Sequence, residues 1–339
     1  MEEILLTSIL VSFILAIITL PRWIKKCHQI DLLWEDMNKF GYPRNVASSG
    51  GVVVVMAFIM GVLSYVAIRV FIFHEGDGLN LSALALLCTI LILALIGIVD
   101  DFLGWKHGGL SIRIRIFLAL AASIPLMVIN AGESQIGIPF LGVISLGIIY
   151  PLFLIPLGIA GASITYNFLA GFNGLEAGQG IIILSFLSFI SYITGSSWLA
   201  LIGLCMVASL IAFLFYNKVP AKVLPGNAMT WSIGGLIAMM AILGNFEKIA
   251  VFVFVLYILE TILKLRGKLK KQSFGIPDKD NNLKRPYNGK IYGMTHLSLY
   301  ILSKFKKEVK EKDVVYFIFA IQIAICLLAL LIFKNTLFV

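Results

Sequence analysis

The chain has 339 residues, of which 60% are hydrophobic and only 13% are charged, and its mean hydropathy is +0.98. A soluble domain of this length needs far more charge to cover its surface, so the composition excludes a soluble protein and indicates one integral membrane domain over residues 1–339. The formal net charge of +9 does not indicate nucleic-acid binding, because the basic residues flank apolar segments and lack interleaved aromatic residues.

Ten apolar segments predict an all-α polytopic protein with about ten transmembrane helices, since a helix needs roughly 20 residues to cross the hydrocarbon core. The first segment follows two glutamates rather than Lys or Arg, so we expect it to be retained and not cleaved as a signal peptide. The sixth and eighth segments are short, which leaves nine or eleven helices as alternatives. The ten segments are 3–20, 50–73, 81–100, 112–130, 143–167, 180–194, 198–216, 231–246, 248–266 and 314–333.

Positive charge separates the loops into two groups. Nearly all loop Lys and Arg residues lie in the first, third, seventh and ninth loops, whereas the even-numbered loops carry only Lys248. The positive-inside rule therefore predicts that the odd-numbered loops are cytoplasmic and that both termini lie outside. The longest loop, 267–312, contains a basic amphipathic stretch beginning at His296, which we expect to lie on the membrane surface.

The third segment ends with two adjacent carboxylates, Asp100 and Asp101, at its predicted cytoplasmic end. The helix dipole opposes a carboxylate at a helix C-terminus by about 0.3–1 kcal/mol, and the two acids also repel each other. Two solvated acids at the membrane boundary are one explanation, but a bound cation or a proton-transfer role explains the placement better. Because neighbouring helical residues point about 100° apart, we expect the two aspartates to play different roles.

Further polar residues gather on the same predicted face. Residues 166–180 form a Gly-rich loop with Asn167, Asn173 and Glu176, which is either a flexible turn or a place where backbone and amide groups contact a base or sugar. Asn227 either caps the eighth segment or lies at a helix N-terminus that attracts phosphate. Acids suited to Mg²⁺ beside bases suited to phosphate indicate phosphoryl transfer.

Two other classes of membrane protein fit the sequence less well. A transporter usually has charged residues at the bilayer midplane and internal repeats, and the sequence shows neither. A CDP-alcohol phosphatidyltransferase usually has several aspartates three and four residues apart on one helix, whereas this chain has one adjacent pair.

The order of the motifs resembles that of the polyprenyl-phosphate N-acetylhexosamine-1-phosphate transferases. The matching motifs are D-M-N-K followed by P and G-G in 36–51, D-D at 100–101, N-x-x-x-G-x-N-G-L-E-A-G-Q at 167–179 and K-V-x-P-G-N at 222–227. The third motif is more similar to the eukaryotic and archaeal branch, which uses UDP-N-acetylglucosamine and dolichyl phosphate, than to the bacterial branch, which uses a UDP-muramoyl-pentapeptide.

The resemblance implies ten transmembrane helices and a reaction that depends on Mg²⁺ or Mn²⁺ at the cytoplasmic membrane surface. N-acetylglucosamine-1-phosphate would pass from UDP-N-acetylglucosamine to a dolichyl-type polyprenyl phosphate and release UMP, as the first step of a lipid-linked glycan pathway. Another UDP-N-acetylhexosamine or undecaprenyl phosphate stays an alternative. The resemblance also favours an archaeal plasma membrane over an endoplasmic reticulum, and it is compatible with a homodimer.

The same resemblance assigns roles to individual residues. Asp100 and Asp101 are implied to be catalytic, and Asn167, Asn227 and Asp101 to surround the metal. The residues implied to bind the substrates are Asp36, Asn38, Lys39, Lys106, Arg113, Arg115, Gly171, Asn173, Leu175, Glu176, Lys222 and His296.

Two positions depart from the family pattern. Asn227 stands where family members typically carry a metal-binding aspartate, which predicts either weaker metal binding or a larger part for the aspartate pair. The ninth loop lacks the His-x-His or Arg-rich motif that helps to select the sugar, and the candidates that remain there are His296, Lys284 and Arg285.

Overall fold

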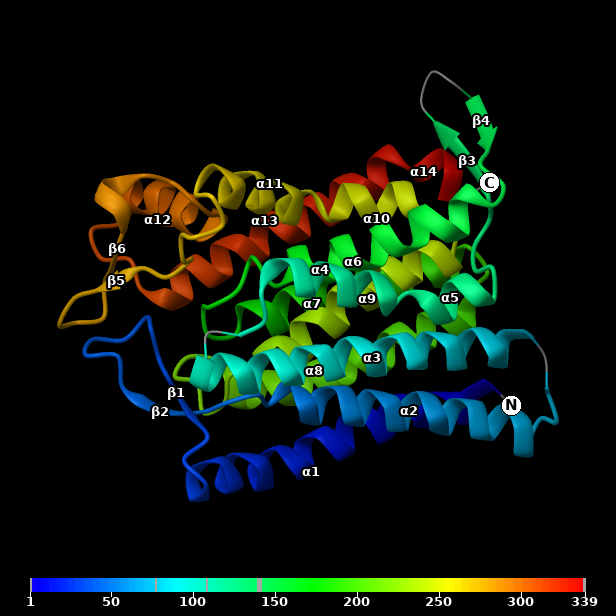
Figure 1. Cartoon of the computed structure of the whole chain (residues 1–339), viewed down its shortest axis with the longest axis horizontal. Helices are drawn as coiled ribbons and strands as arrows, with labels where there is room; N and C mark the ends of the chain where they lie inside the picture. Colours follow the sequence, from blue (N-terminus) through cyan, green and yellow to red (C-terminus); the bar gives the residue numbers. More distant parts are fainter. Residues whose placement is uncertain (1, 77, 108, 139–141, 338–339) are drawn as a thin grey trace.

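Long helices that run side by side form most of the computed structural model, which describes residues 2–76, 78–107, 109–138 and 142–337 (Figure 1). In chain order the helices are η1 (Glu2–Leu6), α1 (Thr7–Gln29), α2 (Gly51–Phe71), α3 (Gly78–His107), α4 (Ile112–Ala121), α5 (Ile124–Val128), η2 (Tyr150–Leu154), α6 (Ile155–Tyr166), α7 (Leu175–Ile193), α8 (Ser197–Asn217), α9 (Gly226–Leu243), α10 (Glu247–Val253), α11 (Val255–Arg266), η3 (Tyr287–Gly289), α12 (Met294–Phe305), α13 (Glu311–Ile332) and α14 (Lys334–Leu337).

Three short antiparallel hairpins supplement the helices without forming a larger sheet. Their registers place Leu33 opposite Ala47 in the first and Ile276 opposite Lys284 in the third. The hairpins pair β1 (Leu33–Glu35) with β2 (Arg44–Ala47), β3 (Gln135–Ile138) with β4 (Gly142–Ser145), and β5 (Ile276–Pro277) with β6 (Leu283–Lys284).

Seven helices in the described part of the chain are long and apolar enough to cross a membrane. They confirm that the protein is a helical, polytopic integral membrane protein. The seven candidate spans are Glu3–Gln29, Gly51–Phe71, Gly78–Gly104, Leu175–Ile193, Ser197–Asn217, Gly226–Leu243 and Glu311–Ile332.

The other three predicted segments coincide with interrupted helices. Residues 112–130 are divided between α4 and α5, 143–167 contain η2 and α6, and 248–266 are divided between α10 and α11. Pro125 lies at the start of α5 and Pro156 at the start of α6, and proline interrupts a helix because it lacks the backbone N–H. A total of ten spans therefore stays a prediction.

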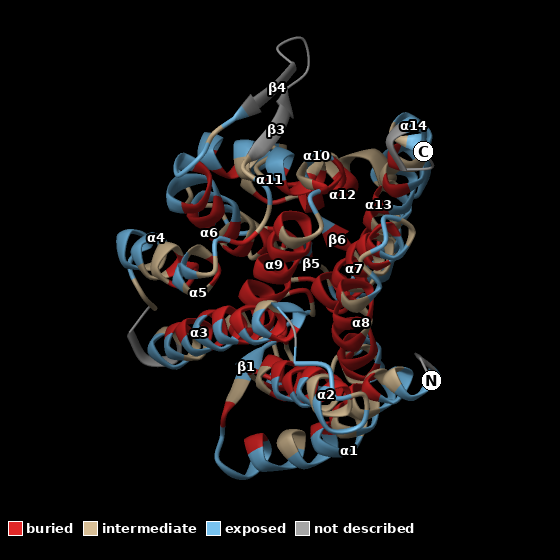
Figure 2. Ribbon diagram, turned by 90° about the vertical axis from the view of Figure 1, so that its right-hand side faces the viewer, coloured by how far each residue is buried: buried red, intermediate tan, exposed pale blue. Residues whose placement is uncertain are grey.

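Helix α9 lies at the centre of the bundle, where it packs against α2, α3, α6, α7, α8 and α10 (Figure 2). Every residue of α9 from Ala228 to Ile242 is buried. The outer helix α1, in contrast, exposes large apolar side chains such as Leu10, Ile14 and Ile18. An apolar surface of that extent is what lipid covers in a membrane protein.

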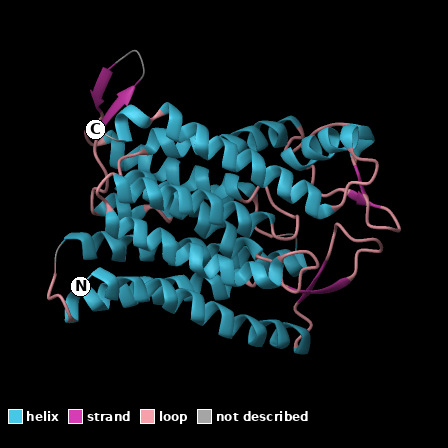
Figure 3. Ribbon diagram, turned by 180° about the vertical axis from the view of Figure 1, so that it is seen from behind, coloured by secondary structure: helices cyan, strands magenta, loops and turns pink. Residues whose placement is uncertain are grey.

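The loops that were predicted to share one side of the membrane do lie at one end of the bundle. This end holds the β1–β2 and β5–β6 hairpins, α12 and the N-terminus of α13, whereas η1, α14 and the β3–β4 hairpin lie at the opposite end (Figures 1 and 3). The separation of the loops from the two termini agrees with the predicted arrangement, and the side of the membrane that each end faces stays a prediction.

Two central helices begin earlier than the hydropathy suggested. α7 begins at Leu175 instead of residue 180, directly after Gly174 in a left-handed conformation, and α9 begins at Gly226 instead of residue 231. The prediction of a loop through residue 180 was therefore wrong for its last residues. The polar side chains Glu176 and Gln179 masked the helix in the hydropathy pattern, yet both are buried in the bundle.

Candidate active site

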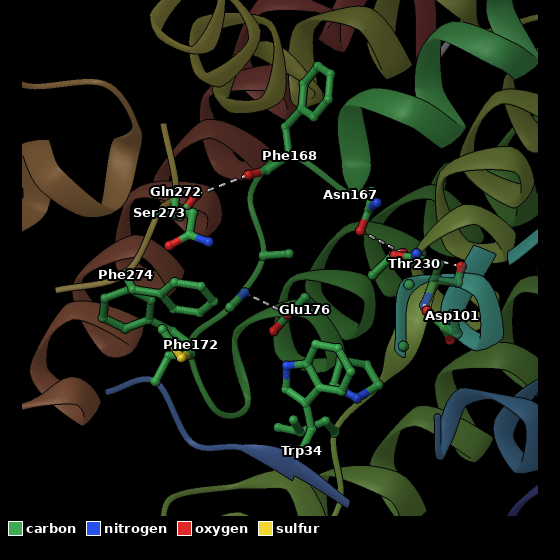
Figure 4. A pocket seen from close by; sticks show the side chains of 18 of the residues that line it. Trp34, Asp101, Asn167, Phe168, Phe172, Glu176, Thr230, Gln272, Ser273 and Phe274 are labelled. Atoms are coloured by element: carbon green, nitrogen blue, oxygen red, sulfur yellow. Dashed lines mark hydrogen bonds between the residues drawn. The ribbon is translucent and has the colours of Figure 1, made fainter. Parts of the chain in front are cut away.

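A cavity of about 580 Å³ opens at the end of the bundle that carries the β1–β2 and β5–β6 hairpins and α12, and Figure 4 shows it from close by. Its walls come from segments that are far apart in the sequence: the β1 loop, the C-terminal end of α3, the Gly-rich loop before α7, the N-terminus of α9 and residues 264–274. Of the predicted catalytic and metal-binding residues, all four line this cavity, namely Asp100, Asp101, Asn167 and Asn227.

Asp100 is the more deeply held member of the aspartate pair. Its side chain is fully buried, and Oδ1 accepts hydrogen bonds from Leu110 N at 2.7 Å and from Arg115 Nη2 at 2.9 Å. Its other oxygen, Oδ2, accepts a hydrogen bond from Asn227 Nδ2 at 2.7 Å. Asp100 therefore joins the loop after α3, the first turn of α4 and the first turn of α9.

Asp101 shares the partner Asn227 with Asp100, through the backbone N–H and not the side chain, and has a more open position. Its Oδ2 accepts a hydrogen bond from Ser49 Oγ at 3.1 Å, and Asn227 N donates to Oδ1 at 2.9 Å and to Oδ2 at 3.0 Å. In the part of the chain that the structure describes, Asp101 makes no ion pair. The surroundings of the two aspartates thus differ, and their different roles stay a prediction.

The close approach of α3 and α9 depends on glycine. A Cβ atom added to Gly97 would lie 2.5 Å from Ala228 N, so a larger residue there would separate the helices. Gly226 has a φ of +69°, a conformation that L side chains rarely adopt, and a Cβ at this position would collide with the Asp101 carboxylate. These two glycines bring the backbone of Asn227 within hydrogen-bonding distance of the aspartate pair.

Asn167 joins the same group from the end of α6. Thr230 Oγ1 donates to Asn167 Oδ1 at 3.1 Å and lies 3.3 Å from Asn227 O. Thr230 is buried one turn into α9, so it fixes the position of the Asn167 amide relative to the first turn of that helix.

A second group of buried polar residues holds the Gly-rich loop. Asn173 N donates to Glu311 Oε1 at 2.7 Å, and Asn173 Nδ2 donates to Asp36 Oδ2 at 2.9 Å. Asn38 Nδ2 donates to Gly171 O at 2.8 Å and to Glu311 Oε1 at 3.3 Å. The D-M-N-K motif of the first loop therefore folds against the loop before α7 and the N-terminus of α13.

Glu311 is the member of this group that the sequence did not reveal. It is buried and forms an ion pair with Lys39. In the sequence it lies in the Lys-rich stretch before the last span, where an acid among basic residues is expected to be exposed to water. Its role depends on contacts with residues more than 130 positions away, for which the sequence carries no local signal.

The long loop after α11 is anchored by a buried Glu–Lys pair. Lys264 Nζ donates to Ser273 Oγ at 2.6 Å and to Lys271 O at 3.0 Å, and lies 3.7 Å from Glu260 Oε1. Glu260 Oε2 accepts a hydrogen bond from Met294 N at the start of α12. Lys264 also lines the cavity, so this pair supplies a cation to the site.

Aromatic side chains form the other end of the cavity. Phe172 and Phe274 lie with Gln272 and Ser273 across from Asn167 and Asp101, and Trp34 lies between these two sides (Figure 4). Gly171, whose φ is +108°, lets Phe274 pack onto the backbone of the Gly-rich loop. The cavity therefore has a charged end beside the aspartates and an apolar end with amide groups.

The predicted substrate-binding residues fall into two sets. Those that line the cavity are Asp36, Arg115, Gly171, Asn173 and Glu176. Those that the cavity lining does not include are Asn38, Lys39, Arg113, Leu175, Lys222 and His296, while the side chain of Lys106 lies outside the described residues. Substrate contacts by the second set stay predictions.

His296 is buried behind the cavity and not on its surface. Its Nδ1 accepts a hydrogen bond from Tyr292 N at 3.3 Å, and its side chain is shielded from solvent. Burial, together with the positive charge of Lys264, lowers the pKa of His296 to about 4. The imidazole is therefore neutral at physiological pH and packs between α12 and the loop before it.

The oxygen atoms around Asp101 suit a hard divalent cation. The described residues contain no group of three His, Cys, Asp or Glu side chains arranged to enclose a metal. Mg²⁺, however, is usually held by one or two carboxylates together with waters and substrate phosphates and not by a complete protein cage. Asp101 with the amide oxygens of Asn167 and Asn227 fits a cation of that kind, shared with a phosphate-bearing substrate.

Comparisons with known proteins give a consistent relationship. The sequence profile described as Glycosyl transferase family 4 matches residues 83–245, which include both aspartates and Asn227. A protein of Saccharolobus solfataricus, provisionally named UDP-N-acetylglucosamine–dolichyl-phosphate N-acetylglucosaminephosphotransferase, is 34% identical over 98% of this chain and 98% of its own length. The protein of that name from Dictyostelium discoideum is 30% identical over 73% of this chain and 67% of its own length.

The relationship extends to bacterial proteins. A phospho-N-acetylmuramoyl-pentapeptide-transferase of Halalkalibacterium halodurans is 27% identical over 79% of this chain and 86% of its own length. The chain therefore belongs to glycosyl transferase family 4, the polyprenyl-phosphate N-acetylhexosamine-1-phosphate transferases whose motifs its sequence carries.

Proposed function

We propose that this protein transfers N-acetylglucosamine-1-phosphate from UDP-N-acetylglucosamine to a dolichyl-type polyprenyl phosphate. The names of the S. solfataricus and D. discoideum relatives describe this reaction for those proteins. The observation that carries the proposal here is a single cavity lined by the aspartate pair, by the cations of Arg115 and Lys264, and by the Gly-rich loop. Another UDP-N-acetylhexosamine or undecaprenyl phosphate is the alternative, since relatives with the muramoyl-pentapeptide name also match.

The proposed reaction is a displacement at phosphorus. An oxygen of the lipid phosphate attacks the β-phosphorus of the UDP-sugar and forms a new P–O bond. The bond from the β-phosphorus to the bridging oxygen breaks, and UMP leaves with the electron pair. The products are UMP and a lipid diphosphate that carries N-acetylglucosamine.

The residues around the cavity have chemistry that suits this displacement. Both reactants are anionic, so Arg115 beside Asp100 would offset their charge at the reacting end, and Lys264 beside Ser273 would offset charge on the side of the nucleotide. Asp100, whose buried carboxylate accepts hydrogen bonds at both oxygens, would position Arg115. Asp101, with Asn167, would hold Mg²⁺ or Mn²⁺, and a metal bound there would neutralise charge that builds up on the phosphates.

The other end of the cavity suits the nucleotide. Glu176 Oε1 accepts a hydrogen bond from Gly171 N at 2.8 Å, and Asn173 is tied to Asp36, so the Gly-rich loop is held in one shape. The aromatic side chains Trp34 and Phe274 offer flat apolar surfaces for a base. These contacts support a role of the loop in binding the UDP moiety.

We further propose ten transmembrane spans, with both termini outside and the cavity at the cytoplasmic surface, in an archaeal plasma membrane and with a homodimer as the assembly. The sidedness rests on the concentration of Lys and Arg at the cavity end. Cysteines introduced at Lys307 and at His74 test this sidedness, because both residues are exposed and they lie at opposite ends of the helix bundle. In sealed right-side-out vesicles an impermeant thiol reagent should label the His74 variant and not the Lys307 variant.

Release of UMP by the purified protein in detergent tests the function. UDP-N-acetylglucosamine with dolichyl phosphate and Mg²⁺ should release UMP, and either EDTA or omission of the lipid phosphate should abolish the release. Parallel reactions with UDP-N-acetylgalactosamine, with UDP-muramoyl-pentapeptide and with undecaprenyl phosphate distinguish the alternatives. UMP release that does not require a lipid phosphate would contradict transfer.

A further inference from the structure

Asn227 contacts both members of the aspartate pair through different groups. Its side-chain Nδ2 donates to Asp100 Oδ2 at 2.7 Å, and its backbone N–H donates to both oxygens of Asp101, at 2.9 and 3.0 Å. The nearest side-chain atom of Asn227 has to be the nitrogen, because an ionised carboxylate can only accept a hydrogen bond. One residue therefore joins two adjacent acids that would otherwise repel each other.

The surroundings of the pair make this amide important. Asp100 is fully buried, and its one ion-pair partner among the described residues, Arg115, contacts Oδ1 and not Oδ2. The described partner of Oδ2 is the Asn227 amide. A buried carboxylate oxygen without a hydrogen-bond donor destabilises the fold. The Asn227 amide therefore stabilises Oδ2 in the place of a cation.

We propose that Asn227 is a positioning residue that assembles the Asp100–Asp101 pair before any divalent cation binds. An aspartate at position 227 would instead bring a third carboxylate against Asp100 Oδ2, and a bound cation or a proton would be needed to hold the three acids together. The site of this chain is therefore preformed without metal and binds a divalent cation more weakly than the same site with an aspartate at 227. The metal part of the inference rests on the proposed function, whereas the part on assembly rests on the hydrogen bonds.

The first test is thermal unfolding of the purified protein in detergent, with EDTA and with Mg²⁺. The wild-type Tm should change little between the two conditions. In EDTA the Asn227→Asp variant should unfold about 5 °C lower, from the loss of a charged hydrogen bond, and Mg²⁺ should restore its Tm. Mn²⁺ binding measured by electron paramagnetic resonance should be at least about tenfold tighter in this variant, because the site gains a negative charge.

A matched control separates this effect from a general loss of packing. Asn217 also lines the cavity, but its Nδ2 donates to the carbonyl oxygen of Val223 at 2.8 Å and not to a carboxylate. Asn217→Asp should lower the Tm equally in EDTA and in Mg²⁺. Rescue of both variants by Mg²⁺ would contradict the specific role of Asn227.

An exchange of the two side chains keeps the proposal testable even if Asn227→Asp alone fails to fold. In the double variant Asp100→Asn, Asn227→Asp, the new amide at 100 can donate to the new carboxylate at 227, while the amide oxygen at 100 still accepts from Arg115. This variant should have a Tm in EDTA close to that of the wild type. A Tm no higher than that of Asn227→Asp, or Mn²⁺ affinity equal in the wild type and Asn227→Asp, would overturn the proposal.

None of these measurements uses turnover, and the Tm comparisons in EDTA, which test the assembly of the pair, are independent of the proposed function. Absence of UMP release by the wild type would count against the function and would leave the Tm comparisons as they stand. Failure of the exchange variant would count against Asn227 even if UMP release is observed.

Discussion

Replacement of Glu311 by glutamine tests whether one buried carboxylate holds the loops around the cavity. Glu311 accepts hydrogen bonds from Asn173 N and Asn38 Nδ2 and pairs with Lys39. Its side chain is 3% exposed and that of Lys39 is 19% exposed. Removing one partner of a buried ion pair costs about 3–5 kcal/mol, but water can reach Lys39 and the glutamine oxygen keeps one acceptor. We therefore expect a lower cost of about 2–3 kcal/mol in unfolding free energy.

The same change should weaken nucleotide binding, since Glu311 orients the Gly-rich loop through Asn173. If the less ordered loop weakens the binding free energy of the UDP-sugar by about 2 kcal/mol, the KM for the UDP-sugar rises by about 30-fold. The KM for the lipid phosphate should change little. The assay is UMP release at varied concentration of each substrate, together with Tm. Glu308→Gln is the matched control, because Glu308 is exposed in the same segment and should tolerate the change. Equal KM for the UDP-sugar in Glu311→Gln and the control would refute the reasoning.

Three further outcomes follow from the contacts of single residues. Asp101→Asn should lower kcat by at least about 100-fold with little change in Tm, since Asp101 has no ion-pair partner in the described chain. A kcat equal to that of the wild type would show that Asp101 takes no part in the reaction. Arg115→Met should lower the unfolding free energy, because the fully buried Asp100 loses its cationic partner. We expect a loss of about 2–3 kcal/mol and not more, since Arg115 is 30% exposed and water can reach its site. An unchanged Tm would contradict this expectation. Burial lowers the pKa of His296 from 6.5 to about 4, so the unfolded chain binds the extra proton first as the pH falls. Stability should then decrease between about pH 6.5 and 4, by at most about 3 kcal/mol, and His296→Gln should flatten this part of the pH profile; an equally steep profile in the variant would show that another group is responsible.

The sequence predicted the features that depend on local pattern. Apolar segments and loop charges anticipated the helices and the gathering of the odd-numbered loops at one end of the bundle. The D-D pair was recognised because two carboxylates at the end of an apolar segment are conspicuous, and Asn167 because it matches the family motif. The structure brings them to one cavity with Asn227, although α3 continues past the predicted end at residue 100 to His107.

The features that the sequence did not predict depend on contacts between distant segments. Glu311 lies in a Lys-rich stretch and Lys264 near the end of an apolar segment, and neither pattern is distinctive. Only the folded chain shows Glu311 buried against Asn173 and Lys264 lining the cavity. The early start of α7 was hidden because Glu176 and Gln179 are polar, although the bundle buries both. In each case a polar side chain is satisfied by a partner that hydropathy cannot identify.

The central claim is that a sugar phosphate, and not a sugar alone, moves to the lipid. UDP-N-acetylglucosamine carrying radioactive phosphorus at the β-phosphate, incubated with the protein, dolichyl phosphate and Mg²⁺, tests this most directly. Attack at the β-phosphorus predicts that the label appears in the lipid fraction and that unlabelled UMP is released in equal amount. Label that stays in a released nucleoside diphosphate, with the sugar on the lipid, would contradict the account.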